Sequence, residues 1–189
     1  MWSSGTEAVN NYLADSTATG IWFGEADMKT GKRTKRVSSG IDAFFPAALA
    51  LSGDVARAEI LERTTRALWN RYGIAPHQID YRTMEVISPS YDLNPRAIES
   101  AYVLYQYTYD ADYLGIGKEI LDSLRTYCRV EEGFAGLSDV IAREKADRME
   151  SHFLSGTLKY LLLLFEPPET LEFRKVMFNS VGHPFRKTW

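Results

Sequence analysis

Apolar residues recur every three to four positions in several separate stretches of this chain, and this periodicity constrains the fold more than any other feature of the sequence. Such spacing places apolar side chains on one face of an α-helix. It predicts a helix over residues 55–72, through Ala58, Ile60, Leu61, Thr64, Leu68 and Trp69. The same pattern predicts an antiparallel pair of helices over 94–108 and 113–127, through Ile98, Ala101, Tyr102 and Tyr105 and through Leu114, Ile120, Leu121 and Leu124.

Local signals mark where these helices begin and end. A Ser-Gly-Asp turn at 52–54 separates the first of them from a shorter helix over 44–51, and Gly73 is placed to close it as a C-cap. Asn94 and Pro95 are predicted as the N-cap and the first helical residue of the next helix. The sequence therefore predicts helical hairpins with short connections.

The stretch DRMESHFLSGTLKYLLLLF, residues 147–165, is the most apolar part of the chain. Asp147 and Glu150 have the spacing of a capping box, which predicts that a helix begins there. Its apolar residues form two faces, one with Met149, Phe153, Tyr160 and Leu164 and one with Leu154, Leu158, Leu161 and Phe165. We therefore expect the C-terminal half of this helix to be buried nearly all round.

Shorter pieces are predicted around these helices. They are a weak helix over 6–14, extended chain over 21–36 that turns at Thr30 and Gly31, a long link over 74–93, a turn and short strand over 130–140, and a strand over 172–181. The elements together predict an all-α fold of helical hairpins with short β-strands or hairpins, in a single domain over residues 1–189.

Composition excludes several classes of protein. With 189 residues and 45% hydrophobic content, the chain can bury a core without disulfides or a metal. Its net charge of −3 comes from interspersed charges, so nucleic acid is not an expected partner. The single cysteine, Cys128, is expected to be a small buried residue. The N-terminus has no signal-peptide pattern, and the longest apolar run, 160–165, is too short to span a membrane.

Five segments carry a more specific signal: AFFPAALALSGDV (43–55), YDLNPRAIESAYVLYQYT (91–108), CRVEEGFAGLSDV (128–140), DRMESHFLSGTLKYLLLLF (147–165) and FNSVGHPF (178–185). In this order they resemble the C-terminal part of glycoside hydrolase family 47, most of all its ER degradation-enhancing α-mannosidase-like branch. The resemblance covers residues from about 21 to 185. It implies part of an (α/α)7 barrel, of which this chain matches less than half.

The resemblance implies removal of α-1,2-linked mannose from high-mannose N-glycans of glycoproteins, with inversion and with a bound Ca²⁺, in the lumen of the endoplasmic reticulum. Inverting hydrolysis needs one carboxylic acid to protonate the leaving oxygen and one carboxylate to activate water. In the family, the acid and a further catalytic aspartate lie in the N-terminal half of the barrel. No segment of this chain matches those motifs.

The matched motifs also differ from the family pattern. The family reads Tyr-Pro-Leu-Arg-Pro-Glu where this chain has YDLNPR, so the position of the catalytic base is Arg96, whereas Glu99 matches a retained acid. A guanidinium stays protonated and cannot accept a proton from water. The resemblance places His152 at the position of an aromatic substrate platform and Gly156 at that of a metal-supporting glutamate. Glu150 keeps the family residue of this substrate-binding motif.

At the C-terminal end, the family's Thr-Glu becomes Ser180 and Val181, so Ser180 is the remaining candidate ligand for Ca²⁺. Three glutamates lost, at 96, 156 and 181, and one arginine gained make the site four units more positive than the family pattern. Calcium takes about 6 to 8 oxygen ligands, usually with carboxylates among them. We therefore expect Ca²⁺ not to bind tightly.

Plainer roles remain open for the same residues. Glu99 either pairs with Arg96 three residues away or keeps a role in the site. His152 is expected to be partly buried and hydrogen-bonded to a neighbour, His77 to face solvent, and His183 to be a turn residue. Capping alone would explain Glu150.

Three functions follow. The first is a truncated or degenerate α-1,2-mannosidase-like protein of N-glycan processing and glycoprotein degradation, catalytically impaired. The second is a structural or interaction module, a pseudoenzyme whose exposed helical faces are covered by a protein partner. The third keeps the enzyme, with another chain supplying the missing half; Arg96 weighs against it.

Overall fold

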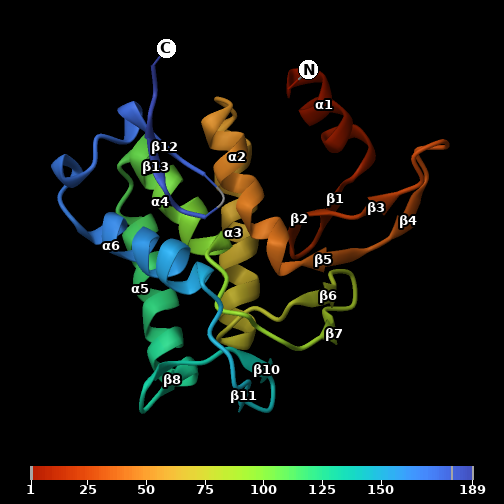
Figure 1. Cartoon of the computed structure of the whole chain (residues 1–189). Coiled ribbons are helices and arrows are strands. Elements are labelled where there is room, and N and C mark those ends of the chain that lie inside the picture. The colour runs from red at the N-terminus through yellow and green to blue at the C-terminus, as the bar shows by residue number, and fades with distance from the viewer. Residues whose placement is uncertain (1, 180, 189) are drawn as a thin grey trace.

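Two helical hairpins form the centre of the molecule (Figure 1). The computed structural model describes residues 2–179 and 181–188. Helices α2 (Phe45–Leu51) and α3 (Val55–Tyr72) make the first hairpin, and α4 (Arg96–Thr108) and α5 (Asp112–Ser123) make the second. Helix α4 contacts α2, α3 and α5, and α6 (Lys159–Phe165) lies against α4 and α5. The core of the molecule therefore surrounds α4.

The bounds of α3 agree with the prediction because both ends carry local signals. The Asp54 side chain accepts a hydrogen bond from the Arg57 amide at 3.4 Å, and Gly73 has a φ of 73°, which closes the helix in the left-handed region. Helix α4 begins at Arg96, one residue later than predicted. Asn94 still makes the hydrogen bond expected of a cap, because its Oδ1 accepts from the Arg96 amide at 3.4 Å, while its side-chain amide donates to the Asp92 carboxylate at 2.9 Å.

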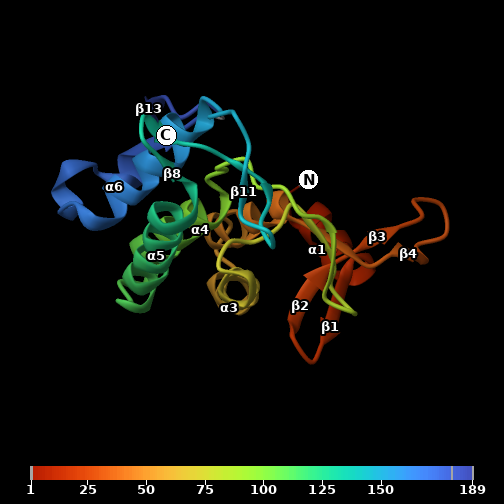
Figure 2. The same ribbon diagram turned by 90° about the horizontal axis from the view of Figure 1, so that it is seen from below.

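Short antiparallel pairs of strands connect and flank the helices. They are β1 (Ala14–Thr17) with β2 (Gly20–Phe23), β3 (Glu25–Ala26) with β4 (Arg33–Lys35), β8 (Arg129–Val130) with β9 (Gly133–Phe134), β10 (Leu137–Asp139) with β11 (Glu144–Lys145), and β12 (Val176–Phe178) with β13 (Pro184–Arg186). Seen from below, α5 and α6 lie on one side of α3, and the β1–β2 and β3–β4 hairpins lie on the other (Figure 2). Helix α1 (Trp2–Tyr12) and the β12–β13 hairpin lie at the same end of the molecule (Figure 1).

One three-stranded sheet joins distant parts of the chain and positions a wall of the site. Its order is β5 (Val37–Ser39), β6 (Gln78–Asp80), β7 (Glu85–Ser88), with Ser38 opposite Ile79. The register brings the 3₁₀ turn η1 (Gly40–Phe44) beside the long link, where the Gly40 amide donates to the His77 carbonyl at 2.8 Å. The predicted link over 74–93 is therefore largely a hairpin rather than irregular chain.

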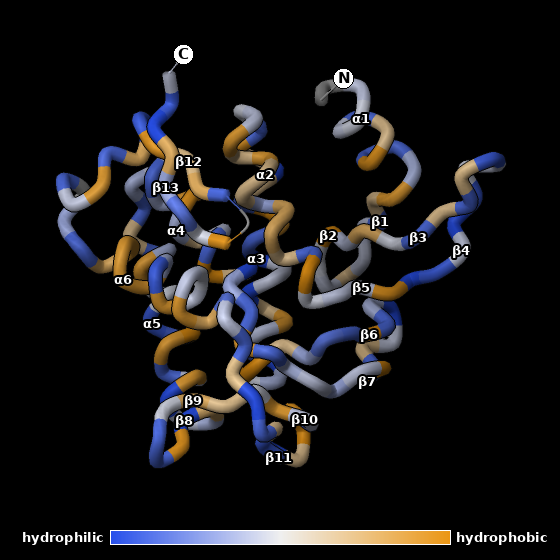
Figure 3. The backbone as a smooth tube through the Cα atoms, in the orientation of Figure 1, coloured by the Kyte–Doolittle hydropathy of each residue, from blue (hydrophilic) through white to orange (hydrophobic). Residues whose placement is uncertain are grey.

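Most of the apolar residues predicted from helical spacing form the core, whereas Ile60 and Met149, predicted on apolar faces, are 40% and 47% exposed. Fully buried side chains include Leu49, Ile98, Leu104, Leu124 and Leu164, and the predicted burial of Cys128, Tyr102 and Phe153 is confirmed. Hydrophobic and hydrophilic segments alternate along the helices, whereas β4 is largely hydrophilic (Figure 3). A smaller cluster of Trp22, Leu68, Ile79 and Tyr81 attaches the strands to α3.

The stretch 147–165 differs from its prediction at both ends. Residues 147–150 are not helical; a π-helical turn η3 (Phe153–Leu158) precedes α6. The predicted capping box is wrong because residues 147–150 bind another part of the same chain. The Arg148 carbonyl accepts from the Gly136 amide at 3.0 Å, and the Glu150 carboxylate pairs with Arg148 at 3.7 Å.

Burial all round this helix is also wrong. Leu154 and Leu162 are each 58% exposed and Phe165 is 49% exposed, because α6 contacts α4 and α5 on one side only. An apolar face remains uncovered along η3 and α6.

Two other helices also differ from prediction at their ends. Helix α1 ends at Tyr12 because Ala14 already pairs in β1, and α5 passes at Ser123 into a second π-helical turn, η2 (Leu124–Cys128). The predicted strand over 172–181 is reduced to β12, preceded by the 3₁₀ turns η4 (Pro168–Thr170) and η5 (Phe173–Lys175). None of the helices in the described ranges is long and apolar enough to cross a lipid bilayer.

Candidate functional site

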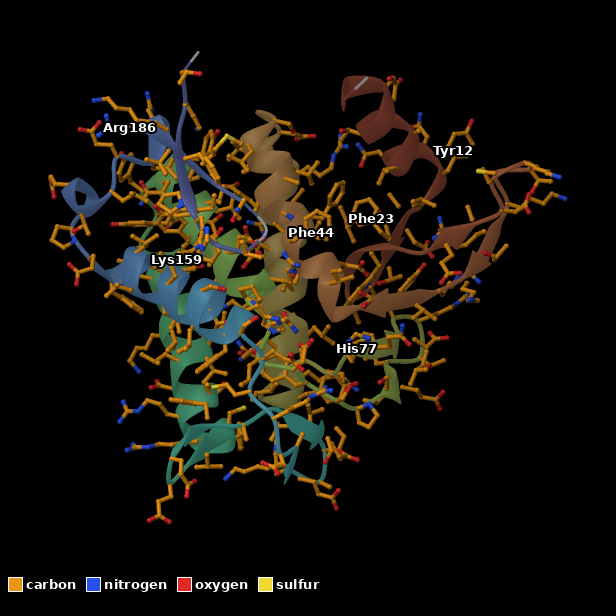
Figure 4. The ribbon with its side chains drawn as sticks, in the orientation of Figure 1. Tyr12, Phe23, Phe44, His77, Lys159 and Arg186 are labelled. Atoms are coloured by element: carbon orange, nitrogen blue, oxygen red, sulfur yellow. The ribbon has the colours of Figure 1, made fainter. Side chains whose placement is uncertain are left out.

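A cavity of about 250 Å³ opens where the start of α4 meets η3, the start of α6 and the loop after β12. Its lining residues are Ile41, His77, Asp92, Asn94, Pro95, Arg96, Glu99, His152, Ser155, Gly156, Lys159, Tyr160, Asn179 and Gly182. Lys159 enters from α6 and His77 from the loop before β6 (Figure 4). Five separate segments of the chain therefore meet at this cavity, which we call the α4–α6 pocket.

Arg96 and Glu99 lie one turn apart on α4 and form one wall of the pocket. The guanidinium Nη1 of Arg96 is 3.6 Å from Oε2 of Glu99, and the two side chains are 37% and 26% exposed. Oε1 of Glu99 accepts a hydrogen bond from the Tyr160 hydroxyl at 2.8 Å. Burial and the negative charge of Glu99 raise the pKa of Tyr160 well above its ordinary value, so this hydroxyl stays protonated and acts as a donor.

Lys159 lines the pocket from the start of α6. Its Nζ donates to the Gly182 carbonyl at 3.4 Å, and it lies 4.3 Å from the ring centroid of Tyr160 and 3.8 Å from that of Phe178. Burial lowers the pKa of Lys159, while Glu99 acts in the opposite direction. The ammonium is thus held among aromatic rings with one long hydrogen bond.

His152 and Asp92 form the floor. The ring Nε2 of His152 donates to the Asp92 carbonyl at 2.9 Å, because a carbonyl oxygen only accepts. Oδ1 of Asp92 accepts from the side-chain amide of Asn94. His152 is therefore partly buried and hydrogen-bonded, as expected from sequence, and it also lines the pocket.

Packing against Pro95 explains why position 156 is a glycine. A Cβ at this position would lie 2.8 Å from Cγ and 2.9 Å from Cβ of the Pro95 ring. A proline ring cannot move aside as a flexible side chain does, so glycine allows η3 to approach the start of α4. This close approach shapes the pocket between the two helices.

The structure brings His152, from the segment 147–165, to the same pocket as Arg96 and Glu99, which share the motif at 91–108. Glu150 lies outside the lining residues and pairs with Arg148. Ser180 lies outside the described residues. His77 is exposed, as expected, yet it lines the pocket rim.

Sequence reasoning missed Lys159, Tyr160, Asp92, Asn94 and Asn179. One signal was present: positions 152, 156 and 159 share a helical face, and Lys159 is the single cation in the run from 153 to 165. A cation amid apolar residues on the face of His152 indicates a polar opening there.

The carboxylates of the pocket offer little to a calcium ion. Asp92 and Glu99 each already accept a hydrogen bond from a neutral side chain. Across residues 2–179 and 181–188, no group of three or more His, Cys, Asp or Glu side chains is placed to hold a metal. Weak binding of Ca²⁺ stays a prediction, and no chemical step is derived through the ion.

Comparisons with known proteins agree with the resemblance in the motifs. The profile described as Glycosyl hydrolase family 47 matches residues 1–187. Alpha-mannosidase I MNS5 of Arabidopsis thaliana is 36% identical over 173 residues, which is 88% of this chain and 29% of that protein. ER degradation-enhancing alpha-mannosidase-like protein 2 of Homo sapiens is 30% identical over 181 residues, which is 95% of this chain and 31% of that protein.

A solved structure supports the fold. The chain superposes on alpha-1,2-mannosidase from Trichoderma reesei with a TM-score of 0.84 at 21% identity, over 98% of this chain and 46% of that one. The predicted fold is thus confirmed as part of an (α/α)7 barrel. This chain spans less than a third of each of these two relatives and under half of the solved barrel.

Proposed function

This chain belongs to glycosyl hydrolase family 47, and on that premise we propose that its α4–α6 pocket recognises terminal mannose of high-mannose N-glycans without hydrolysing it. The chain would act in N-glycan processing and glycoprotein degradation in the lumen of the endoplasmic reticulum. The names of relatives that contain "ER degradation-enhancing" support this setting.

One observation carries the proposal: Arg96, at the position that the family motif gives to the base, lines the pocket. Inverting hydrolysis needs two carboxyl groups about 6.5 to 9.5 Å apart, one of which takes a proton from water. Arg96 cannot take that proton. The nearby carboxylate of Glu99 is already engaged by Tyr160 and faces Arg96.

Sugar binding needs hydrogen-bonding groups but no proton acceptor for water, and the pocket supplies such groups. In the described part of the chain, the side-chain amides of Asn94 and Asn179 keep N–H donors and the imidazole of His152 keeps Nδ1 as an acceptor for sugar hydroxyls, whereas both amide oxygens already accept from backbone amides. The volume, about 250 Å³, lies below the roughly 300–1,000 Å³ of sites for drug-sized ligands. A single terminal sugar residue is the ligand that this size favours.

The test separates binding from turnover. Purified protein is incubated with α-1,2-mannobiose, with and without added Ca²⁺, and free mannose is measured. In parallel, binding of a high-mannose glycan is followed by nuclear magnetic resonance. We expect binding without release of mannose. Release of mannose above a no-protein control contradicts the absence of catalysis, and absence of glycan binding contradicts the proposal as a whole.

A second candidate function, an interaction module, is favoured by the uncovered apolar face of Leu154, Leu162 and Phe165. In this case the face would be covered by another protein, and the pocket would have no ligand. The variant Leu162→Ser would then weaken association with that partner and leave glycan binding absent. Glycan binding by the isolated, monomeric chain decides against this alternative.

A further inference from the structure

We propose that the α4–α6 pocket selects a mannoside that carries a compact oxyanion, a phosphate or sulfate ester, held between Arg96 and Lys159. This inference rests on the proposed function and adds to it the chemical class of the sugar. A neutral mannose substrate, as in the family, does not require an anionic group. The preference for an oxyanion follows from which hydrogen-bonding groups of the pocket are already used and which are free.

The acidic groups of the pocket are satisfied by neutral donors. The carboxylate of Glu99 accepts from the Tyr160 hydroxyl at 2.8 Å, and that of Asp92 accepts from the Asn94 amide at 2.9 Å. Both donors come from the pocket wall itself. Neither acid therefore needs a cation from the ligand.

The two cations are much less well satisfied. A guanidinium has five N–H donors, and the Arg96 side chain makes one ion pair, at 3.6 Å, beyond ordinary hydrogen-bond length. Lys159 makes one hydrogen bond, at 3.4 Å, to a carbonyl. No other polar partner is recorded for these two side chains in residues 2–179 and 181–188. The formal charges of the pocket cancel, two against two, yet its unused donors are cationic.

A ligand oxyanion would accept hydrogen bonds from these unused cationic donors. Charge-assisted hydrogen bonds to phosphate and sulfate are among the stronger polar contacts, and Arg forms them in pairs. Lys159 is partly withdrawn from water, so it loses less hydration when it pairs with an anion. The pocket also lies at the N-terminus of the 13-residue helix α4, whose dipole favours negative charge.

A neutral mannose fits this arrangement less well. Its hydroxyls meet Asn94, Asn179 and His152, but they leave Arg96 with its single long ion pair to Glu99 and Lys159 with one long hydrogen bond to a carbonyl. An ester on the sugar adds oxygens that reach the cations while the ring keeps the neutral contacts. The pocket therefore distinguishes the ester from the plain sugar by the charged pair alone.

The experiment is isothermal titration calorimetry at pH 7 and low ionic strength, with D-mannose, mannose 6-phosphate, mannose 6-sulfate and inorganic phosphate as probes. A single charge-assisted hydrogen bond corresponds to roughly a tenfold gain in affinity. We expect at least one ester to bind about 10-fold or more tightly than mannose. The affinities for mannose 6-phosphate and mannose 6-sulfate show which ester the pocket prefers.

Matched variants locate the effect. Arg96→Gln and Lys159→Gln should each lower the affinity for the ester towards that for mannose, and Lys159→Arg should keep it. Arg125→Gln and Lys118→Gln remove the same kinds of charge from exposed positions on η2 and α5 and should change nothing. Circular dichroism spectra confirm that each variant is folded.

Every outcome bears on the inference. Equal affinity for mannose and both esters overturns it, and so does unchanged ester binding in the Arg96 and Lys159 variants. Inorganic phosphate that binds as tightly as mannose 6-phosphate overturns the role of the sugar. If a neutral high-mannose glycan binds and the esters gain nothing, this inference alone fails. If neither the glycan nor the esters bind, the proposed function fails with it.

Discussion

Two glutamates on neighbouring helices, Glu99 on α4 and Glu62 on α3, have opposite environments. Glu99 lines the α4–α6 pocket, whereas Glu62 lies in the interior. Glu99 is partly exposed and has Tyr160 and Arg96 as partners. Glu62, on α3, is 1% exposed, and neither of its carboxyl oxygens has a hydrogen-bond partner in the described part of the chain. The same side chain is thus a usable polar group in one place and a buried acid in the other.

Access to hydrogen-bond partners and water, rather than residue type, therefore separates these two carboxyl groups. Arg66 is one turn from Glu62 on α3, but its guanidinium already binds Glu119, with Nε at 3.0 Å, and Asp112 at 3.1 Å. Burial therefore raises the pKa of Glu62 to about 8, opposed only by the charge of Arg66. Glu62 is therefore mainly protonated at pH 7.

The largest expected effect is the pH dependence of stability. The pKa of Glu62 rises from its ordinary value of 4.5 to about 8 on folding, so the folded state binds more protons between these values. The unfolding free energy should therefore fall as pH rises from about 4.5 to about 8, by at most about 1.4 kcal/mol per pH unit from this group. Chemical denaturation of the wild type and of Glu62→Gln measures it: the difference between the two curves should change with pH. Parallel curves would contradict a buried, unpaired acid.

The next effect concerns the partner that Glu99 has and Glu62 lacks. Tyr160→Phe removes the hydroxyl that donates to Glu99 and should cost about 1.5 to 3 kcal/mol of unfolding free energy, as for hydrogen bonds to charged groups. Tyr102→Phe is the matched control, since its buried ring has no hydrogen bond recorded among the described residues and should change little. Equal effects of the two changes would show that Glu99 gains nothing from Tyr160.

A smaller effect is expected from alanine substitution of two glycines, Gly156 in the pocket wall and Gly115 on α5. Gly156→Ala brings a Cβ against the Pro95 ring, and overpacking of about 1 to 3 kcal/mol outweighs the gain of about 1 kcal/mol in helix propensity. Gly115→Ala on α5 meets only the Arg66 guanidinium, at 3.8 Å, and should stabilise by up to about 1 kcal/mol. Thermal unfolding should give shifts of opposite sign; a stabilised Gly156→Ala would show that η3 does not need to approach Pro95.

The smallest effect is that of Arg96 on stability. Its pair with Glu99 is long and partly exposed, so Arg96→Gln should change the unfolding free energy by less than about 0.5 kcal/mol. Denaturant titration measures this directly. A larger loss would make Arg96 a structural residue and would remove the reason to assign it to a ligand.

The parts of the fold that the sequence predicted are those with local causes. Helix α3 has an acceptor side chain at one end, glycine at the other and helical spacing between, so its bounds follow from neighbouring residues. The pairing of Arg96 with Glu99 follows from a spacing of three residues. The prediction for residues 147–150 was wrong because Gly136, distant in the chain, supplies the hydrogen bond that keeps this segment extended.

The site divides in the same way. Two motifs identified Arg96 with Glu99, in the segment 91–108, and His152, in the segment 147–165. Lys159 was missed because it sits in an apolar run, and its exposure to the pocket depends on the turn that carries Gly182. Glu62 also gave no signal, since a glutamate in an amphipathic helix is usually on the solvent side. Its burial results from the packing of α3 against α4 and α5, where Glu62 lines a small void with Ala97 and Ile116.

From the sequence alone, apolar spacing predicted most of the helices, and the motifs carried the resemblance to the family, in which Arg96 stands at the predicted position of the base. Those properties depend on spacing and on the chemistry of single side chains. Only the tertiary structure decided which charged groups keep access to water and which lose it. Hydration and hydrogen-bond partners come from segments far apart in the chain, so the raised pKa of Glu62 and the unused donors of Arg96 and Lys159 arise only once the helices are packed together.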